Sequence, residues 1–420
     1  MSNTTETITA RLREALSRRS AEDRARIEAK LEHAHHQVLQ AVQGVPGSRG
    51  SEIAEFSRAH GLLQRGRDLL ADVEDAIGGT PDPQGGIYRD GTYELLDVGW
   101  LEALLTWVEN AGERAPFGTR PATIEIPNDI DVAVLGDWGT GDFGTPQAPS
   151  GSTLIRQYVS QTLRPAITIH LGDVYFTGTE DNERTKFLDI FPAGRTGSYT
   201  LNSNHEMYPG ARGYFDVALA SSTFGGQQGT SYFCLHNDDW ALVGLDTAYY
   251  ADYWDMYMAG TLRDPSGGSV QLDFLREVAS SGRQIILLSH HNPVSLPGEP
   301  TALLAQVDEA LAGTPSGAKP VIWYYGHLHN GAVYEDVVSP GGVTIRPRLS
   351  GHAAVPYTVA TDLTKSKKVR WLERAYVSGH HGPVRNGFST LDLSGSKLRE
   401  RMLDQTGHVS WEESSVAKSS

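Results

Sequence analysis

The first hundred residues carry apolar side chains at the spacing of amphipathic helices. Ile8, Leu12 and Leu16 recur every fourth residue, as expected for one face of a helix. The same period predicts further helices over 20–42, 51–77 and 100–108, separated by stretches rich in glycine and proline. We therefore expect an N-terminal helical region over residues 1–115, which could cap the rest of the chain or mediate homo-oligomer formation.

From residue 131 the pattern changes to alternating strands and helices. Apolar runs over 130–135 and 167–171 each end in a Gly-Asp pair, and a helical apolar face over 154–163 separates them. Such a unit implies parallel strands joined by a right-handed crossover. Further strands are expected at 198–202, 231–235, 240–245, 284–289 and 320–325, with helices at 271–280 and 301–312.

The last part of the chain predicts a hairpin followed by a tail. Residues 386–407 alternate apolar and polar side chains on either side of a glycine-containing turn, and the final dozen residues are polar. The chain thus divides into the helical region 1–115, an α/β domain over 128–405 and a polar tail over 406–420.

Charge and cysteine content narrow the class of protein. Lys and Arg number 36 against 51 Asp and Glu, a net charge of −15, which argues against long nucleic acids as partners. No apolar run approaches the about 18 residues of a membrane span, and the polar N-terminus lacks the apolar core of an export signal. Cys234 is the only cysteine, so no internal disulfide can form. We expect a cytoplasmic protein with no membrane partner.

Polar side chains follow the predicted strands directly, where parallel strands share one edge of a sheet. The side chains in question are Asp137, Asp173, Asn204 with His205, His290 with His291, and His327 with His329. Carboxylates, an amide and imidazoles suit Fe, Mn or Zn, and there are enough of them for two divalent or trivalent metal ions that share one carboxylate.

The motifs containing these residues resemble the five blocks of the calcineurin-like metallophosphoesterases. They read GDWG (136–139), GDVY (172–175), NHE (204–206), HHNP (290–293) and GHLH (326–329), and the resemblance covers residues 130–400. The first two blocks are closest to the purple acid phosphatase branch. The resemblance implies an α/β fold with four layers, in which a two-sheet β-sandwich is flanked by helices, and hydrolysis of phosphate esters at a dinuclear metal centre.

The resemblance also implies roles for single residues. Asp173 would bridge the two metals. Asp137 and His329 would hold the first metal. Asn204, His327 and one of the pair His290 and His291 would hold the second. The spacing to Pro293 favours His291 as the ligand and leaves His290 facing the substrate, although the reverse assignment stays open. His205 would contact the phosphate and protonate the leaving oxygen, and Glu206 would orient His205.

The chain departs from the family at the first metal. The wider family has histidine where this chain has Gly139, and the purple branch has tyrosine where it has Phe176. Tyr175 lies one residue earlier and could supply the ligand. Ser203 stands where the family has glycine.

Three histidines in loops outside the five blocks are further candidates for binding the substrate. They are His352, His380 and His381.

The sequence thus predicts a dinuclear-metal phosphoesterase that hydrolyses phosphate monoesters or small diesters, through attack of metal-bound hydroxide on a small phosphorylated substrate. The alternative is a protein of the same fold with weak or no catalysis, which binds partners through its helical N-terminal region. The missing ligand at the first metal keeps this alternative open, whereas the presence of Asn204, His205 and both histidines of GHLH argues against it.

Overall fold

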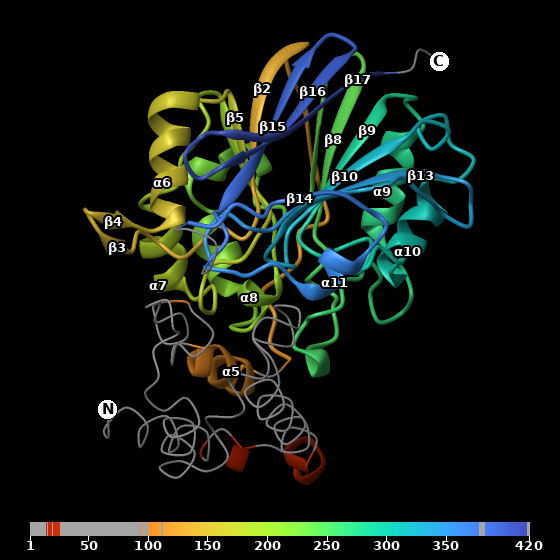
Figure 1. The fold of residues 1–420 in the computed structure, drawn as a ribbon. Helices are drawn as coiled ribbons and strands as arrows, with labels where there is room; N and C mark the ends of the chain where they lie inside the picture. The colour runs from red at the N-terminus through yellow and green to blue at the C-terminus, as the bar shows by residue number, and fades with distance from the viewer. Residues whose placement is uncertain are drawn as a thin grey trace.

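The computed structural model of the protein describes residues 14, 16–18, 20–25, 93, 100–110, 112–377 and 383–417. Two stacked β-sheets form the centre of this part of the chain, and helices cover both outer faces (Figure 1). The predicted fold class, a two-sheet sandwich flanked by helices in four layers, is confirmed.

The larger sheet has nine strands and is mostly parallel at its centre. Its order is β1 (Ala122–Glu125), β7 (Phe233–His236), β8 (Trp240–Leu245), β9 (Gln284–Ser289), β10 (Val321–Tyr325), β13 (Thr344–Ser350), β11 (Gly331–Tyr334) and β14 (Val369–Leu372), with β12 (Val337–Val338) paired to β13.

The smaller sheet has six strands, and its strands β2, β5 and β6 run parallel to one another. Its order is β17 (Val409–Val416), β16 (Lys397–Asp404), β15 (Gly387–Ser394), β2 (Asp129–Leu135), β5 (Ile167–His170) and β6 (Gly197–Thr200). A separate two-stranded ribbon joins β3 (Gly144–Thr145) to β4 (Ala148–Pro149).

Helices and helical turns connect the strands. The α-helices are α5 (Trp100–Glu109), α6 (Gly151–Tyr158), α7 (Glu180–Asn182), α8 (Asn204–Met207), α9 (Val270–Ala279), α10 (Ala302–Leu311) and α11 (Thr361–Lys365). Turns of π-helix are η1 (Val159–Leu163), η2 (Glu183–Leu188) and η3 (Gly213–Ala218), and turns of 3₁₀-helix are η4 (Ser222–Gln227) and η5 (Tyr253–Asp255).

Three apolar clusters hold the layers together. The cluster between the sheets joins side chains such as Val134 and Ile169 of the smaller sheet to Leu242 and Ile322 of the larger one. A second cluster packs α9 and α10 on the outer face of the larger sheet, and a third packs α6 on the outer face of the smaller sheet. Strands buried on both faces explain why their sequences read as unbroken apolar runs rather than as alternating patterns.

The C-terminal hairpin is confirmed as β15 and β16, but the expectation of a polar tail from residue 406 is wrong. Residues Val409–Val416 form β17, which pairs antiparallel with β16 at the edge of the smaller sheet. Pairing at the edge of a sheet uses the backbone N–H and C=O groups, so the polar composition of β17, none of whose residues is buried, does not prevent it.

The fourth predicted N-terminal helix is confirmed as α5. Most of the helical region predicted over 1–115 lies outside the described residues. No helix in the described part of the chain has the length and apolar character needed to cross a membrane.

Candidate metal centre

The predicted donor side chains lie in loops at the carboxyl ends of parallel strands from both sheets. Asp137, Asp173 and Asn204 follow β2, β5 and β6 of the smaller sheet, while His290 and His327 follow β9 and β10 of the larger sheet. The stacking of the two sheets therefore brings five loops, distant in sequence, to one place.

The backbone at four of the predicted donor residues has a positive φ angle, which residues other than glycine rarely adopt. The φ angles are +60° at Asp137, +76° at Asp173, +69° at His327 and +38° at His329. Such strained residues persist only where the surrounding structure holds them, and they cluster at functional sites. The strain is thus independent support for a site at this edge.

The side chains form two donor groups that meet at Asp173. On one side, Asp173 Oδ2 lies 3.6 Å from His329 Nε2, which is also 3.8 Å from Asp137 Oδ2. On the other side, Asp173 Oδ1 lies 3.3 Å from His290 Nε2. The two oxygens of this carboxylate thus face different donor groups, as expected of a ligand shared by two metal ions.

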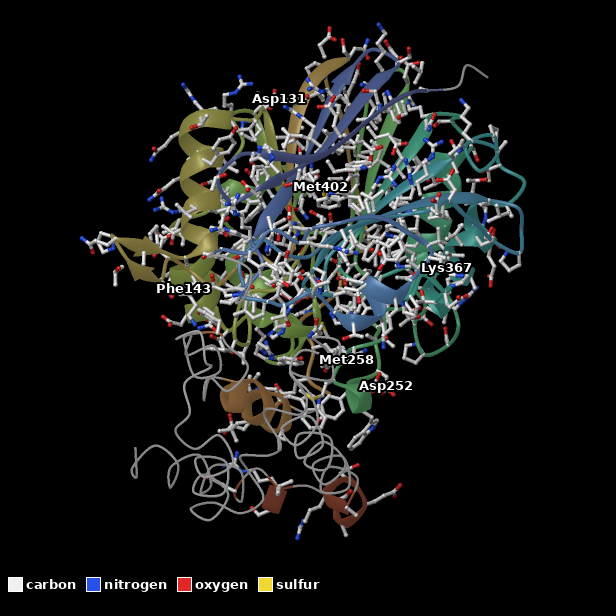
Figure 2. All side chains as sticks on the ribbon, in the orientation of Figure 1. Asp131, Phe143, Asp252, Met258, Lys367 and Met402 are labelled. Atoms are coloured by element: carbon white, nitrogen blue, oxygen red, sulfur yellow. The ribbon has the colours of Figure 1, made fainter. Side chains whose placement is uncertain are left out.

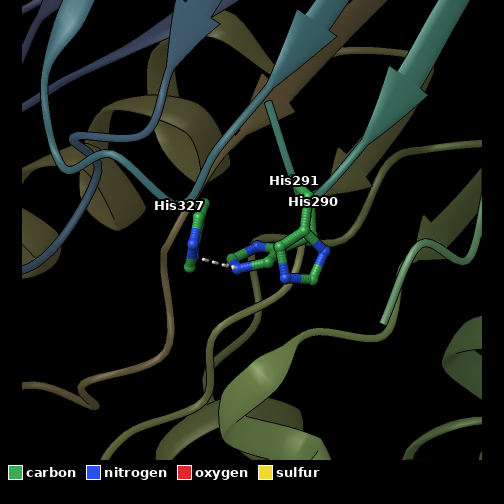
Figure 3. A group of neighbouring side chains, drawn as sticks. All are labelled: His290, His291 and His327. Atoms are coloured by element: carbon green, nitrogen blue, oxygen red, sulfur yellow. Dashed lines mark hydrogen bonds between the residues drawn. The ribbon is translucent and has the colours of Figure 1, made fainter. Parts of the chain in front are cut away.

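The second group contains His290, His327 and Asn204. His290 Nε2 is 3.1 Å from His327 Nδ1 and 2.8 Å from Asn204 Oδ1 (Figure 3). The far nitrogen of each imidazole faces a backbone carbonyl oxygen: His290 Nδ1 lies 3.0 Å from Leu171 O, and His327 Nε2 lies 3.1 Å from Met258 O.

If these far nitrogens donate their protons to the carbonyls, the neutral rings turn two lone pairs toward each other. Two nitrogen ligands on one zinc ion, each about 2.0–2.1 Å from the metal, lie roughly 3.0–3.4 Å apart. The observed separation of 3.1 Å between His290 and His327 therefore fits a metal held by both rings, with the carbonyls as outer partners.

His291 lies beside these rings but is engaged elsewhere (Figure 3). One of its ring nitrogens lies within 4.8 Å of a ring nitrogen of His290 and of His327. However, His291 Nε2 lies 2.8 Å from the carbonyl oxygen of Tyr257, and Nδ1 lies 2.8 Å from the hydroxyl oxygen of Thr247. If Nε2 donates to the Tyr257 carbonyl and Nδ1 accepts from the Thr247 hydroxyl, both nitrogens of the neutral His291 ring have a partner.

The electrostatics of the site suit metal binding. Burial alone would raise the pKa of Asp173, but the imidazoles of His290 and His205 lower it well below its ordinary value. Burial lowers the pKa of His290 to about 3, against the opposing effect of Asp173. At neutral pH the carboxylate is therefore charged and the imidazole neutral, which are the forms that bind metals.

Tyr175 reaches the first donor group. Its hydroxyl lies 3.0 Å from Asp173 Oδ2 and 2.8 Å from His329 Nε2, and its ring is fully buried. The side chain of Phe176 instead stacks on Tyr93, with ring centroids 4.6 Å apart. Tyr175 therefore brings a phenol oxygen next to the donor atoms of Asp173 and His329.

The packing around Gly139 leaves no room for a histidine at this position. A Cβ atom at this residue would lie 2.3 Å from the carbonyl oxygen of Asp173 and 2.6 Å from Cα of Val174. The loop carrying Tyr175 packs directly on Gly139, whose carbonyl accepts the Tyr175 N–H at 2.9 Å. Any side chain at 139 would displace this loop.

His205 and Glu206 lie beside the donors but point in different directions. The His205 ring lies 4.7 Å from the ring of Tyr175, centroid to centroid, and its Nδ1 is 2.7 Å from the carbonyl oxygen of Phe176. The Glu206 carboxylate accepts the backbone N–H of Val174 at 3.0 Å and contacts the Ser203 hydroxyl. Burial and the charge of Asp173 raise the pKa of Glu206 to about 7. Glu206 thus contacts the loop that carries Asp173.

An aromatic loop over residues 249–258 covers the second donor group. Met258 of this loop contacts His327 through its carbonyl, and Figure 2 shows Met258 and Asp252 on the side of the sandwich where α5 lies. Trp107 of α5 donates its indole N–H to the carbonyl of Tyr253 at 3.0 Å and stacks on its ring at 5.0 Å. The loop is therefore held between α5 and the site.

The other predicted substrate residues divide into two cases. The ring of His352 is buried so tightly that a Cβ atom at Gly331 or Gly387 would meet its Nε2 within 2.6 Å. His380 and His381 lie outside the described residues.

The sequence did not indicate that Tyr93 and Trp107 pack near the site. A helical or loop pattern does not show which distant residues a side chain will contact.

The family of the central segment follows from its sequence match. Residues 130–331 match the sequence model of the calcineurin-like phosphoesterases. This segment is a calcineurin-like phosphoesterase domain. Both donor groups lie within the calcineurin-like domain, while α5 and the strands after β11 lie outside the matched residues.

Comparisons with whole proteins give more distant likenesses. No curated protein matches the chain. Among solved structures, a dimetal phosphatase from Danio rerio is 14% identical, with 71% of this chain and 100% of that chain covered and a TM-score of 0.45. Vacuolar protein sorting 29 from Cryptosporidium parvum is 13% identical, with 69% and 98% covered and a TM-score of 0.30.

Proposed function

We propose that the protein is a dinuclear-metal-dependent phosphoesterase that hydrolyses phosphate monoesters or small diesters. The observation that carries this proposal is the division of the Asp173 carboxylate between two donor groups, with Oδ1 3.3 Å from His290 Nε2 and Oδ2 3.6 Å from His329 Nε2. A single metal site would need only one of these groups.

The residues that would hold the metals follow from the contacts. Asp137, Tyr175 and His329 would hold the first metal, and Asn204, His290 and His327 the second, with Asp173 shared. We prefer His290 to His291 because both nitrogens of His291 have partners outside the donor groups. When bound, the metals would supply Lewis-acid chemistry, lowering the pKa of a water and neutralising charge on the phosphoryl oxygens.

The chain itself would provide orientation and proton transfer. His205 would protonate the leaving oxygen, because its ring lies 4.7 Å from that of Tyr175 beside the first donor group and its Nδ1 is held 2.7 Å from the carbonyl oxygen of Phe176. Glu206 would act as a positioning residue for the loop of Asp173 rather than by orienting His205, because its hydrogen bonds go to that loop. The low exposure of the donors, 4% or less, would exclude water and strengthen these interactions.

Turnover of chromogenic esters tests this proposal. Metal-reconstituted protein should hydrolyse a phosphate monoester or diester, and the ratio of the two rates would assign the substrate class. Asp173→Asn should abolish turnover. Asp142→Asn is the matched control, because Asp142 pairs with Arg156 at 2.7 Å in a partly exposed loop and should not affect catalysis. Absence of turnover with Mn, Zn and Fe would favour the non-catalytic binding protein instead.

We further propose that Tyr175 coordinates iron as in the purple acid phosphatase branch, given its hydroxyl in the first donor group. Protein loaded with ferric iron should then show a visible phenolate-to-iron absorption band, and Tyr175→Phe should lose it. A wild-type protein that binds iron without this band would overturn the assignment of Tyr175.

A further inference from the structure

Ser203 occupies a junction between the two loops on which the metal centre depends. Its side chain is fully buried directly before α8, the helical turn that carries Asn204 and His205. The Ser203 hydroxyl oxygen accepts the backbone N–H of His205 at 3.1 Å and so caps this turn. The residue therefore fixes where the turn begins.

The same hydroxyl holds Asp173 at two points. Ser203 Oγ accepts the backbone N–H of Asp173 at 3.1 Å and donates to Asp173 Oδ1 at 2.5 Å. Glu206, one turn further on, contacts Ser203 Oγ and accepts the N–H groups of Asp173 and Val174 at 3.4 and 3.0 Å. Ser203 and Glu206 thus tie the loop of Asp173 to α8.

The bond to Asp173 is selective for one of its oxygens. Oδ1, which Ser203 contacts, faces His290 of the second donor group, whereas Oδ2 contacts the Tyr175 hydroxyl in the first group. Each oxygen of the shared carboxylate therefore has its own hydroxyl partner on its own side.

From this geometry we propose that Ser203 is a positioning residue that orients Asp173 Oδ1 for the second metal. The inference rests on the proposed function, since it concerns the same centre. Outer partners of metal ligands, when removed, typically cost about 10–100-fold in metal affinity or activity. A glycine at 203 would leave α8 without this cap and Oδ1 without this donor.

Calorimetric titration of Mn²⁺ into metal-free protein tests the proposal. Wild-type protein should bind two ions. Ser203→Ala should weaken one of the two binding events by about 10–100-fold and leave the other near its wild-type affinity. Ser269→Ala is the matched control, because Ser269 also caps a helix, accepting the Leu272 N–H at 3.1 Å at the start of α9. It should lower thermal stability without changing either metal affinity.

Each other outcome has a defined meaning. Unchanged affinities in Ser203→Ala would overturn the proposal, as would an equal loss at both sites, which indicates a general structural role. If Ser203→Ala does not fold, Ser203→Gly takes its place in the titration, and failure of both to fold would also overturn it. Wild-type protein that binds no metal would overturn the proposed function itself, whereas two ions bound with the same affinities in wild-type and in Ser203→Ala would overturn this inference alone.

Discussion

A buried ion pair between the two sheets gives a sharp prediction for stability. Arg348 of β13 and Glu400 of β16 are both fully buried, and the guanidinium Nε and Nη2 lie 3.0 and 3.3 Å from the two carboxylate oxygens. The Tyr324 hydroxyl donates to the same carboxylate at 2.7 Å. We predict that Glu400→Gln, which keeps the shape and removes the charge, destabilises the sandwich.

The structure sets the size of this effect. Removing one partner of a buried ion pair costs about 3–5 kcal/mol, because the other charge stays buried. Arg348 would keep Glu413, 3.6 Å from its Nη2, and the ring of Trp411 at 5.1 Å, so we expect the lower end, about 3 kcal/mol. With an unfolding entropy of about 2.1 cal/mol/K per residue over roughly 300 residues, the melting temperature should fall by about 5 °C.

Urea-induced unfolding, followed by circular dichroism, measures this loss. Glu412→Gln is the matched control, because Glu412 pairs with Arg399 on the neighbouring strand, where both side chains are at least 40% exposed. Its unfolding midpoint should stay at the wild-type value. The combined Arg348→Met and Glu400→Leu variant should recover much of the loss, since apolar replacements of a buried pair are often neutral. A Glu400→Gln midpoint equal to that of Glu412→Gln would show that the buried pair does not stabilise the sandwich.

Three further predictions concern single residues elsewhere in the chain. Gly139→Ala should lower the free energy of unfolding by about 1–3 kcal/mol and reduce the metal content, because its Cβ would lie 2.3 Å from the Asp173 carbonyl oxygen. Urea-induced unfolding measures the first effect and elemental analysis the second. Burial raises the pKa of the Cys234 thiol to about 12, so a thiol reagent at pH 8 should label it only after unfolding; labelling of the native protein would contradict this. Burial would raise the pKa of Asp404, but hydrogen bonds from Thr406 and Arg385 lower this pKa overall. The charged Asp404 carboxylate therefore stabilises the folded protein above its ordinary pKa, and this stabilisation is lost as the pH falls. Asp404→Asn should therefore be less stable than wild-type at pH 7, and urea titrations should show the gap closing as pH falls below about 4.

The sequence could predict the fold and the place of the site because both follow from local patterns. Apolar runs that end in Gly-Asp indicate parallel strands, and parallel strands bring their ends together. The positions of Asp137 and Asp173 after β2 and β5 agree with this expectation.

The finer features of the site could not be predicted, because they depend on contacts between distant loops. Which nitrogen of which histidine faces the donors depends on carbonyls such as that of Tyr257, 34 residues before His291. The approach of Tyr175 to His329 requires a loop packed on Gly139. The strand β17 was missed because none of its residues is buried and its sequence carries no apolar alternation, so it pairs with β16 without the pattern that indicates a strand.

The number of bound metal ions and the magnetic coupling between them show whether the protein holds a dinuclear centre. We would load the protein with Mn²⁺, remove excess metal, measure manganese per chain and record the electron paramagnetic resonance spectrum. We predict two ions per chain with an exchange-coupled signal, and loss of that coupling in Asp173→Asn, because this carboxylate faces both donor groups. One ion per chain, or two without coupling, would contradict a shared dinuclear centre.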